Sequence, residues 1–144
     1  MFCFGGKKEN GKVTNELKIL RIDVREFFWV VPKTKGMPPL PRYQHTMELY
    51  EPARFLVIYG GMDDHRNIQN KPAFYTHMGI LDLTTFSWLT ALVYGDTVPP
   101  RCSHVSCFVD SKFIIFGGLY NRGFNKPYVS YFEVNQVNVV NLRR

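Results

Sequence analysis

The sequence lacks the features that mark a membrane-spanning, secreted or structural-zinc protein. It has no run of about 18 apolar residues, which a membrane helix requires, and its first residues lack the basic and apolar segments of a secretory signal. Its three cysteines, Cys3, Cys102 and Cys107, form no C-x-x-C pair, and no Asn-x-Ser/Thr acceptor occurs. We therefore expect neither a disulfide framework nor a structural zinc site, and we interpret the cysteines as buried thiols in a reducing compartment.

A large apolar fraction and an excess of positive charge are present instead. Apolar residues make up 45% of the 144 residues, aromatic residues 15% and charged residues 21%. This composition is typical of a globular domain rather than a disordered tail. The formal net charge is +6, which an acidic partner surface or solubility alone would explain. No segment has a sustained apolar period of 3.6 residues, so we expect no amphipathic helix.

One unit of sequence occurs three times. Its most visible element is an aromatic residue followed by a glycine pair, at Gly5-Gly6, Gly60-Gly61 and Gly117-Gly118, with spacings of 55 and 57 residues. Repetition at such a period is typical of propellers and solenoids. The chain is therefore expected to contain three copies of one structural unit.

The first two copies share two further motifs. Asp23 and Asp82 each follow a hydrophobic residue and precede a tryptophan, Trp29 or Trp88, by six residues. After the same interval in both copies comes the motif Pro-Arg-x-x-His, which contains Arg42 and His45 in one copy and Arg101 and His104 in the other.

The third copy departs from this pattern. It keeps an acid in Phe132-Glu133-Val134 but has Val139 where a tryptophan is expected. We interpret this copy as degenerate or truncated.

Short apolar runs rich in β-branched and aromatic residues dominate each unit. Residues 55–59 and 113–116 end at glycine pairs and are too short for helices, and their continuous apolar character predicts strands covered on both faces. Asp110-Ser111 and Leu83-Thr84-Thr85 predict hairpin turns. Each unit should therefore form four antiparallel strands: A from Arg-x-x-His, B ending at Gly-Gly, C ending at the acid, and D holding the tryptophan.

The ordered set of Gly-Gly, hydrophobic-Asp, Trp and Pro-Arg-x-x-His resembles the kelch repeat, which builds one blade of a β-propeller. The resemblance implies an all-β fold of kelch-type β-propeller blades, with about two and three-quarter four-stranded antiparallel blades in this chain. Residues 1–35 would supply strands B to D of one blade, 42–95 a complete blade, and 101–144 strands A to C with or without a degenerate D. Because propellers close with about four to eight blades, we expect a piece of a longer polypeptide, or open blade faces packed on a partner.

Residues needed once per blade should serve blade geometry, because a catalytic group is needed only once per protein. Glycine permits close approach of main chains, tryptophan fills the space between blades, and the acids and histidines form structural hydrogen bonds. Asp63-Asp64-His65 has no second ligand set, so we expect no metal site and no cofactor. The expected structural residues are Gly5, Gly6, Gly60, Gly61, Gly117, Gly118, Asp23, Asp82, Glu133, Trp29, Trp88, His45 and His104.

The candidate binding surface is one rim of the blades. In an A-B-C-D meander the B-to-C and D-to-A connections emerge on the same side, and here they are the long ones. They hold eleven basic and four acidic residues, a net charge of +7, against −1 on the opposite rim. Solvated loops without a partner are one alternative, and a structural role for the two repeat arginines is another. The candidate partner-binding residues are Lys33, Lys35, Arg42, Arg66, Lys71, Arg101, Tyr120, Arg122, Phe124 and Lys126.

The resemblance implies a non-enzymatic protein–protein interaction module. We expect a cytoplasmic scaffold subunit of a larger cytoskeletal or ciliary-type assembly, docking an acidic partner through this rim. The alternative is a substrate receptor of a ubiquitin ligase, since kelch-like proteins serve both roles. A galactose-oxidase-like or specifier-type enzyme is less favoured, because the four histidines show no copper or iron ligand spacing. Nucleic acid is a less favoured partner than protein, and no membrane contact is expected.

Overall fold

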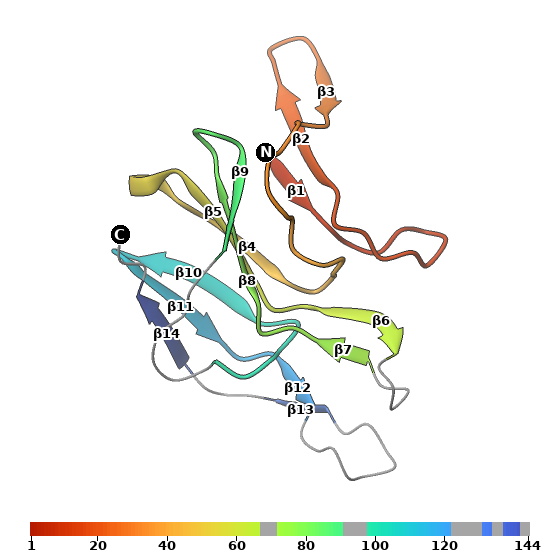
Figure 1. Cartoon of the computed structure of the whole chain (residues 1–144), viewed down its shortest axis with the longest axis vertical. Helices are drawn as coiled ribbons and strands as arrows, with labels where there is room; N and C mark the ends of the chain where they lie inside the picture. The colour runs from red at the N-terminus through yellow and green to blue at the C-terminus, as the bar shows by residue number, and fades with distance from the viewer. Residues whose placement is uncertain (67–71, 91–97, 122–130, 134–136, 142–144) are drawn as a thin grey trace.

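A computed structural model describes residues 1–66, 72–90, 98–121, 131–133 and 137–141 (Figure 1). These residues form fourteen short strands and one 3-10 helix. No helix in the described ranges is long and apolar enough to cross a membrane. The elements in order are β1 (Phe2–Phe4), β2 (Leu17–Ile22), β3 (Phe27–Val30), β4 (Thr46–Tyr50), η1 (Glu51–Ala53), β5 (Phe55–Tyr59), β6 (Met62–Arg66), β7 (Pro72–Phe74), β8 (Met78–Asp82), β9 (Ser87–Thr90), β10 (Val105–Val109), β11 (Lys112–Phe116), β12 (Leu119–Asn121), β13 (Tyr131–Glu133) and β14 (Val137–Asn141).

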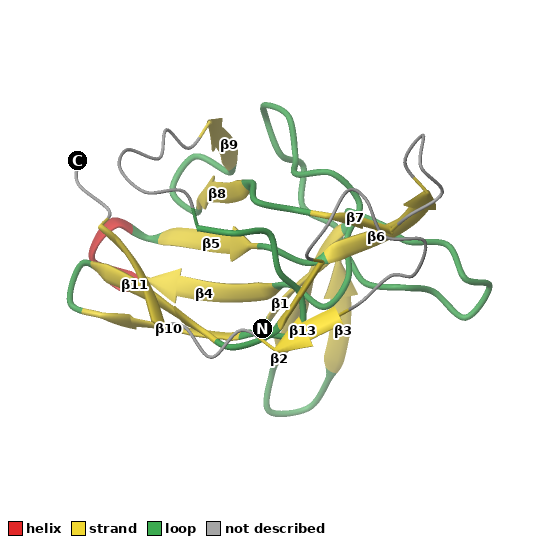
Figure 2. Cartoon of the chain, turned by 90° about the horizontal axis from the view of Figure 1, so that it is seen from below, coloured by secondary structure: helices red, strands yellow, loops and turns green. Residues whose placement is uncertain are grey.

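Three antiparallel sheets form three successive blades, which lie side by side in Figure 1. The first blade is β1-β2-β3, which are strands B, C and D of the repeat. The second blade, β4-β5-β8-β9, has all four strands, and the third blade, β10-β11-β14, has strands A, B and C. The expected all-β fold of kelch-type blades is therefore confirmed. The short η1, red in Figure 2, lies in the turn between β4 and β5.

The two hydrophobic cores lie between blades rather than within one. Along β5, Leu56 and Ile58 belong to the core shared with the first blade, whereas Val57 and Tyr59 belong to the core shared with the third. Side chains alternate between the two faces of a strand, so a strand between two blades must be apolar at every position. This explains the continuous apolar sequence of residues 55–59.

A second, smaller hairpin extends the B-to-C connection in two blades. After Gly60-Gly61 the chain forms β6 and β7, and after Gly117-Gly118 it forms β12 and β13. Figure 1 shows both hairpins at the end of the blades where the glycine pairs lie. These hairpins account for the length of the connections.

The third blade corrects one sequence-based assignment. Glu133 lies in β13, opposite Leu119 of β12, and not at the end of strand C. Strand C is β14, because Asn141 pairs with Lys112 as Asp82 pairs with Phe55 in the second blade. The prediction for Glu133 was wrong because β12 and β13 lengthen the connection, and Asn141 takes the register position of the repeat acid.

Candidate functional site

The arginine of the Pro-Arg-x-x-His motif is an internal tie within its own blade. Arg42 has no exposed surface, and its guanidinium donates hydrogen bonds to the carbonyl oxygens of Gly60 at 2.9 Å, His77 at 3.2 Å and Leu40 at 3.1 Å. It also lies 4.6 Å from the ring centroid of Tyr75, within the range of a cation–π contact. No motif of the repeat marks Tyr75. The arginine therefore joins the start of strand A to the end of strand B and the start of strand C.

Arg101 repeats this arrangement in the third blade. It is also fully buried and donates to the carbonyl oxygen of Gly117 at 3.1 Å and to that of Pro99 at 3.4 Å. Burial lowers the pKa of Arg42 to about 10, so this guanidinium remains charged at neutral pH. Burial also lowers the pKa of Arg101. The prediction that Arg42 and Arg101 contact a partner was wrong, because main-chain carbonyl groups inside the blades hold both.

The same arginines join adjacent blades through their main chains. The amide of Gly6 donates to the carbonyl oxygen of Arg42 at 2.7 Å, and the amide of Gly61 donates to that of Arg101 at 2.8 Å. Gly60 has a φ of +66°, and a Cβ atom there would lie 2.6 Å from the carbonyl oxygen of Arg101. The glycine pair therefore lets the end of one blade meet the start of the next at main-chain contact distance.

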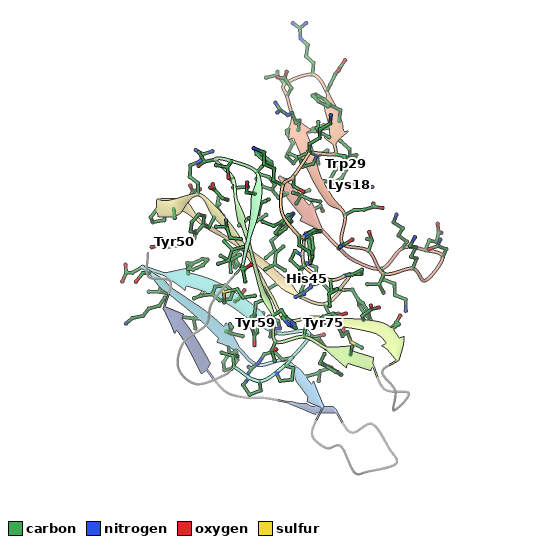
Figure 3. All side chains as sticks on the ribbon, viewed as in Figure 1. Lys18, Trp29, His45, Tyr50, Tyr59 and Tyr75 are labelled. Atoms are coloured by element: carbon green, nitrogen blue, oxygen red, sulfur yellow. The ribbon has the colours of Figure 1, made fainter. Side chains whose placement is uncertain are left out.

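The two repeat histidines lie inside the blade junctions. Nε2 of His104 is 2.9 Å from Oγ1 of Thr46, and its ring meets the ring of Tyr59 edge to face, with centroids 5.6 Å apart. The ring of His45 meets Phe4 in the same way at 5.7 Å. Burial, and then the neighbouring repeat arginine, lower the pKa of each histidine to about 4. Figure 3 shows His45 and Tyr59 in the middle of the molecule.

Lowering the pH from 7 to 5 is expected to destabilise the protein through these histidines. The unfolded chain takes up protons near pH 6.5 that the folded chain does not bind until about pH 4. Stability is therefore complete above pH 6.5 and falls as the pH decreases toward 4, by up to about 1.4 kcal/mol per pH unit for each histidine. Urea unfolding at pH 7, 6 and 5 measures the effect, and His104→Gln should make the dependence shallower. Equal stability at pH 7 and pH 5 would contradict it.

The repeat acids lie at the turn between strands C and D. The carboxylate of Asp82 accepts hydrogen bonds from the amide of Thr84 at 2.7 Å and from the hydroxyl of Thr85 at 2.9 Å. These bonds lower the pKa of Asp82. Asp23 accepts one bond, from the amide of Val24 at 2.6 Å. Both acids thus accept hydrogen bonds within the turn between strands C and D, which stabilises the turn.

The two repeat tryptophans differ in their environment. Trp88 is 7% exposed and packs against Phe4 of the first blade, with ring centroids 5.4 Å apart. Trp29 is 54% exposed, on the face of the first blade that points away from the second (Figure 3). Trp88 thus fills a space between two blades, as expected. Among the described residues no blade packs on Trp29, so for Trp29 this role stays a prediction.

The cysteines also differ from expectation. Cys102 is buried, and burial raises the pKa of its thiol, whereas Cys3 and Cys107 are exposed. Cys3 and Cys107 lie on the outward faces of the first and third blades. Within the described ranges, no three His, Cys, Asp or Glu side chains gather where they could hold a metal ion.

We call the end of the blades where the glycine pairs lie the Gly-Gly rim. The β1–β2 connection forms part of this rim. Lys7 forms an ion pair with Asp64 of β6 at 2.6 Å, which joins the long connections of two neighbouring blades. Lys8 pairs with Glu16 at 2.8 Å. Lys12 is exposed and takes part in no ion pair within the described part of the chain.

A small hollow of about 210 Å³ lies beside this connection, between Lys8, Lys18 and the exposed Trp29. Lys18 was not among the sequence-predicted residues. Its alternation with Leu17, which is buried, is the signal that places it on the outward face.

The remaining candidate partner-binding residues are spread over the molecule. Lys33 is exposed. Lys35 was wrongly placed on the Gly-Gly rim, because it bridges Ser87 at the opposite end of the second blade. Arg66 lies on β6 and Tyr120 on β12, whereas the others lie outside the described residues, namely Lys71, Arg122, Phe124 and Lys126.

Two successive junctions built from the same glycine pair, arginine and histidine define the chain as a β-propeller repeat protein. A family model described as the KLHDC2/KLHL20/DRC7 Kelch-repeats domain matches residues 1–143. The chain belongs to this kelch-repeat family. Membership of the family implies a protein–protein interaction module.

Two similar proteins are much longer than this chain. The chain is 32% identical over 136 residues to host cell factor of Drosophila melanogaster, and the match covers 83% of this chain and 9% of that protein. It is 31% identical over 119 residues to dynein regulatory complex subunit 7 of Chlamydomonas reinhardtii, covering 82% of this chain and 10% of that protein. The chain thus spans about a tenth of these two relatives.

The fold is also found in a solved structure. A chain from the cryo-EM structure of RAG in complex with one melted and one unmelted RSS superimposes with a TM-score of 0.67 at 18% identity. The match covers 99% of this chain and 46% of that chain. This similarity supports the fold.

Proposed function

We propose that the chain is a non-enzymatic scaffold module that docks an acidic protein segment through the Gly-Gly rim, in a cytoskeletal or ciliary type of assembly. The observation that carries the docking proposal is the hydrogen-bonded β1–β2 connection, on which Lys12 is exposed. The amide of Lys8 donates to the carbonyl oxygen of Lys12 at 2.9 Å, and the amide of Lys12 donates to the side chain of Asn10 at 3.1 Å. A main chain held in this way loses less entropy when the loop binds a partner.

The assembly type is supported by the kelch-repeat relatives, one of which is named a dynein regulatory complex subunit. A scaffold needs a rigid body with partner-facing loops, and the two tied junctions provide the rigid body. A substrate receptor of a ubiquitin ligase would use the same loops, and the identity of captured companions distinguishes the two roles.

Charge reversal at the rim is expected to abolish capture of an acidic partner. The variant carries Lys12→Glu, Arg66→Glu and Arg122→Glu, which place negative charge on three long connections. Like charges across an interface lower both affinity and association rate, so we expect a loss of more than tenfold in recovered companions. The measurement is affinity capture of the tagged protein from cells, with quantitative mass spectrometry.

A matched control reverses the same number of cations at the opposite end of the blades. Arg25, Arg54 and Lys112 lie in or beside the turns between β2 and β3, β4 and β5, and β10 and β11. Their replacement by Glu changes the net charge equally and should leave capture unchanged. Equal loss in both variants would point to net charge alone, and no loss in the rim variant would refute acidic docking.

A further inference from the structure

The linker between the first and second blades contains a proline-rich pattern that the repeat does not require. Residues 35–41 have the sequence Lys-Gly-Met-Pro-Pro-Leu-Pro, in which a cation precedes two pairs of an apolar residue and a proline, Met37-Pro38 and Leu40-Pro41. The last proline belongs to the Pro-Arg-x-x-His motif, but the one three residues before it does not. The linker to the third blade has Thr97 at that position. Blade geometry therefore does not account for the pattern.

The prolines restrict residues 37–41 to a polyproline II conformation. Each proline fixes its own φ near about −65°, and the residue before a proline avoids the helical region. Gly36 has a φ of +75°, so the chain turns there and the polyproline II segment begins after it. This helix has three residues per turn, so residues three apart share one ridge. The three ridges are Met37 with Leu40, Pro38 with Pro41, and Pro39 alone.

The blades cover the third of these ridges. Pro39 packs on the second blade, because a Cβ atom at Gly79 would clash with Cγ of Pro39. The carbonyl oxygen of Pro39 accepts a hydrogen bond from Nδ2 of Asn15 at 3.0 Å, and that of Leu40 accepts one from the guanidinium of Arg42 at 3.1 Å. These contacts hold the main chain of the segment in place between the first and second blades.

The other two ridges remain accessible. Met37 is 88% exposed and Leu40 is 55% exposed, whereas Pro38 and Pro41 are half-buried. A groove that binds a polyproline II helix contacts two of its three ridges, and the third ridge points away from the groove. The covered ridge of Pro39 is therefore the one that such a groove does not need. Lys35, which is exposed, adds a positive charge just before the segment.

We propose that residues 35–41 are a ligand for a protein domain of the SH3 type. The aromatic-lined groove of such a domain takes the pairs Met37-Pro38 and Leu40-Pro41, and acidic residues at the end of the groove meet Lys35. The main chain is already ordered in the free protein, so binding costs less entropy than it would for a flexible peptide. The inference does not rest on acidic docking, since the rim variant proposed above leaves residues 35–41 unaltered.

Binding of the intact protein to an array of purified SH3 and WW domains tests the proposal. We expect at least one SH3 domain to bind, and isothermal titration calorimetry then gives the Kd for each variant. Met37→Ala and Leu40→Ala each remove the apolar member of one pair and should weaken binding by about tenfold or more. Both side chains are exposed, so the fold should persist, as far-UV circular dichroism would show. Val24→Ala is the matched control, because Val24 is 98% exposed in the β2–β3 turn, and its Kd should be unchanged.

Two further measurements test the partner's groove. Lys35→Glu should weaken binding at least as much as Leu40→Ala, because like charges would then face each other at the acidic end of the groove. Replacement of an aromatic residue that lines the SH3 groove should abolish binding. Binding to no SH3 domain or to WW domains alone overturns the proposal, as does a Kd that Met37→Ala, Leu40→Ala and Lys35→Glu leave unchanged.

Discussion

Gly60→Ala is expected to destabilise the protein by about 2–4 kcal/mol. The new Cβ atom would lie 2.6 Å from the carbonyl oxygen of Arg101 and 2.6 Å from Cε1 of His104. The first of these atoms belongs to the main chain that joins the second and third blades, so it cannot move aside without separating them. A φ of +66° adds about 1 kcal/mol of backbone strain for alanine, and overpacking of this kind adds about 1–3 kcal/mol.

Gly11→Ala separates backbone strain from the clash. Gly11 has a φ of +81°, and no atom lies within 4 Å of the Cβ that alanine would add. We therefore expect a loss of about 1 kcal/mol for Gly11→Ala. Urea unfolding followed by far-UV circular dichroism compares both variants with the unaltered chain. If Gly60→Ala lost no more stability than Gly11→Ala, the close approach of the blades would not be what requires glycine at position 60.

The recurring motifs predicted the blades because each motif residue forms a specific contact between neighbouring strands or neighbouring blades. Glycine at position 60 is needed for the approach of Arg101, and the same approach places Gly5 beside the carbonyl oxygen of Arg42. Identical contacts require identical residues at identical spacing. The spacing of the motifs was therefore sufficient to predict the strand order of the first two blades.

The third blade could not be assigned in the same way. Spacing locates a strand only when the connection before it keeps its length, and β12 and β13 lengthen the connection here. Glu133 follows apolar residues as Asp82 does, so the sequence alone made it the better match to the repeat acid. Pairing with β11 distinguished the two segments, and pairing is a long-range property.

Charge counting on loops also had a physical limit. The net charge of the rim counted Arg42 and Arg101 equally with exposed lysines. In the structure both arginines donate to main-chain carbonyl oxygens, and because every residue has such a group, the sequence does not mark these partners. Lys35 was assigned to the Gly-Gly rim because it lies in the sequence between strands D and A. In the structure its main chain runs beside β9, at the opposite end of the blade. The sequence predicted how many cations the connections hold, and the fold determined which of them reach solvent.

Arg42→Met is expected to destabilise the protein by about 3 kcal/mol, despite removing a buried charge. A pKa lowered from 12.5 to about 10 corresponds to roughly 3 kcal/mol against burying the charged guanidinium, and methionine would recover this amount. The buried carbonyl oxygen of Gly60 would then lose a donor at about 1–3 kcal/mol, and the part-buried carbonyl oxygens of His77 and Leu40 would lose one at about 1 kcal/mol each. The cation–π contact with Tyr75, about 2 kcal/mol when desolvated, would also be lost. Together these losses outweigh the recovered term, so the net effect should be destabilising.

Two further variants locate the cause of the loss. Arg42→Lys keeps the charge but cannot reach three carbonyl groups with a planar fork, so its stability should lie between those of Arg42→Met and the unaltered chain. Arg21→Met is the matched control, because Arg21 is exposed on β2 and should lose less than about 0.5 kcal/mol. Denaturant unfolding at pH 7 gives all three values. If Arg42→Met were as stable as the unaltered chain, the cost of burying the charge would exceed the hydrogen bonds it forms, and Arg42 would not be a tie within the blade.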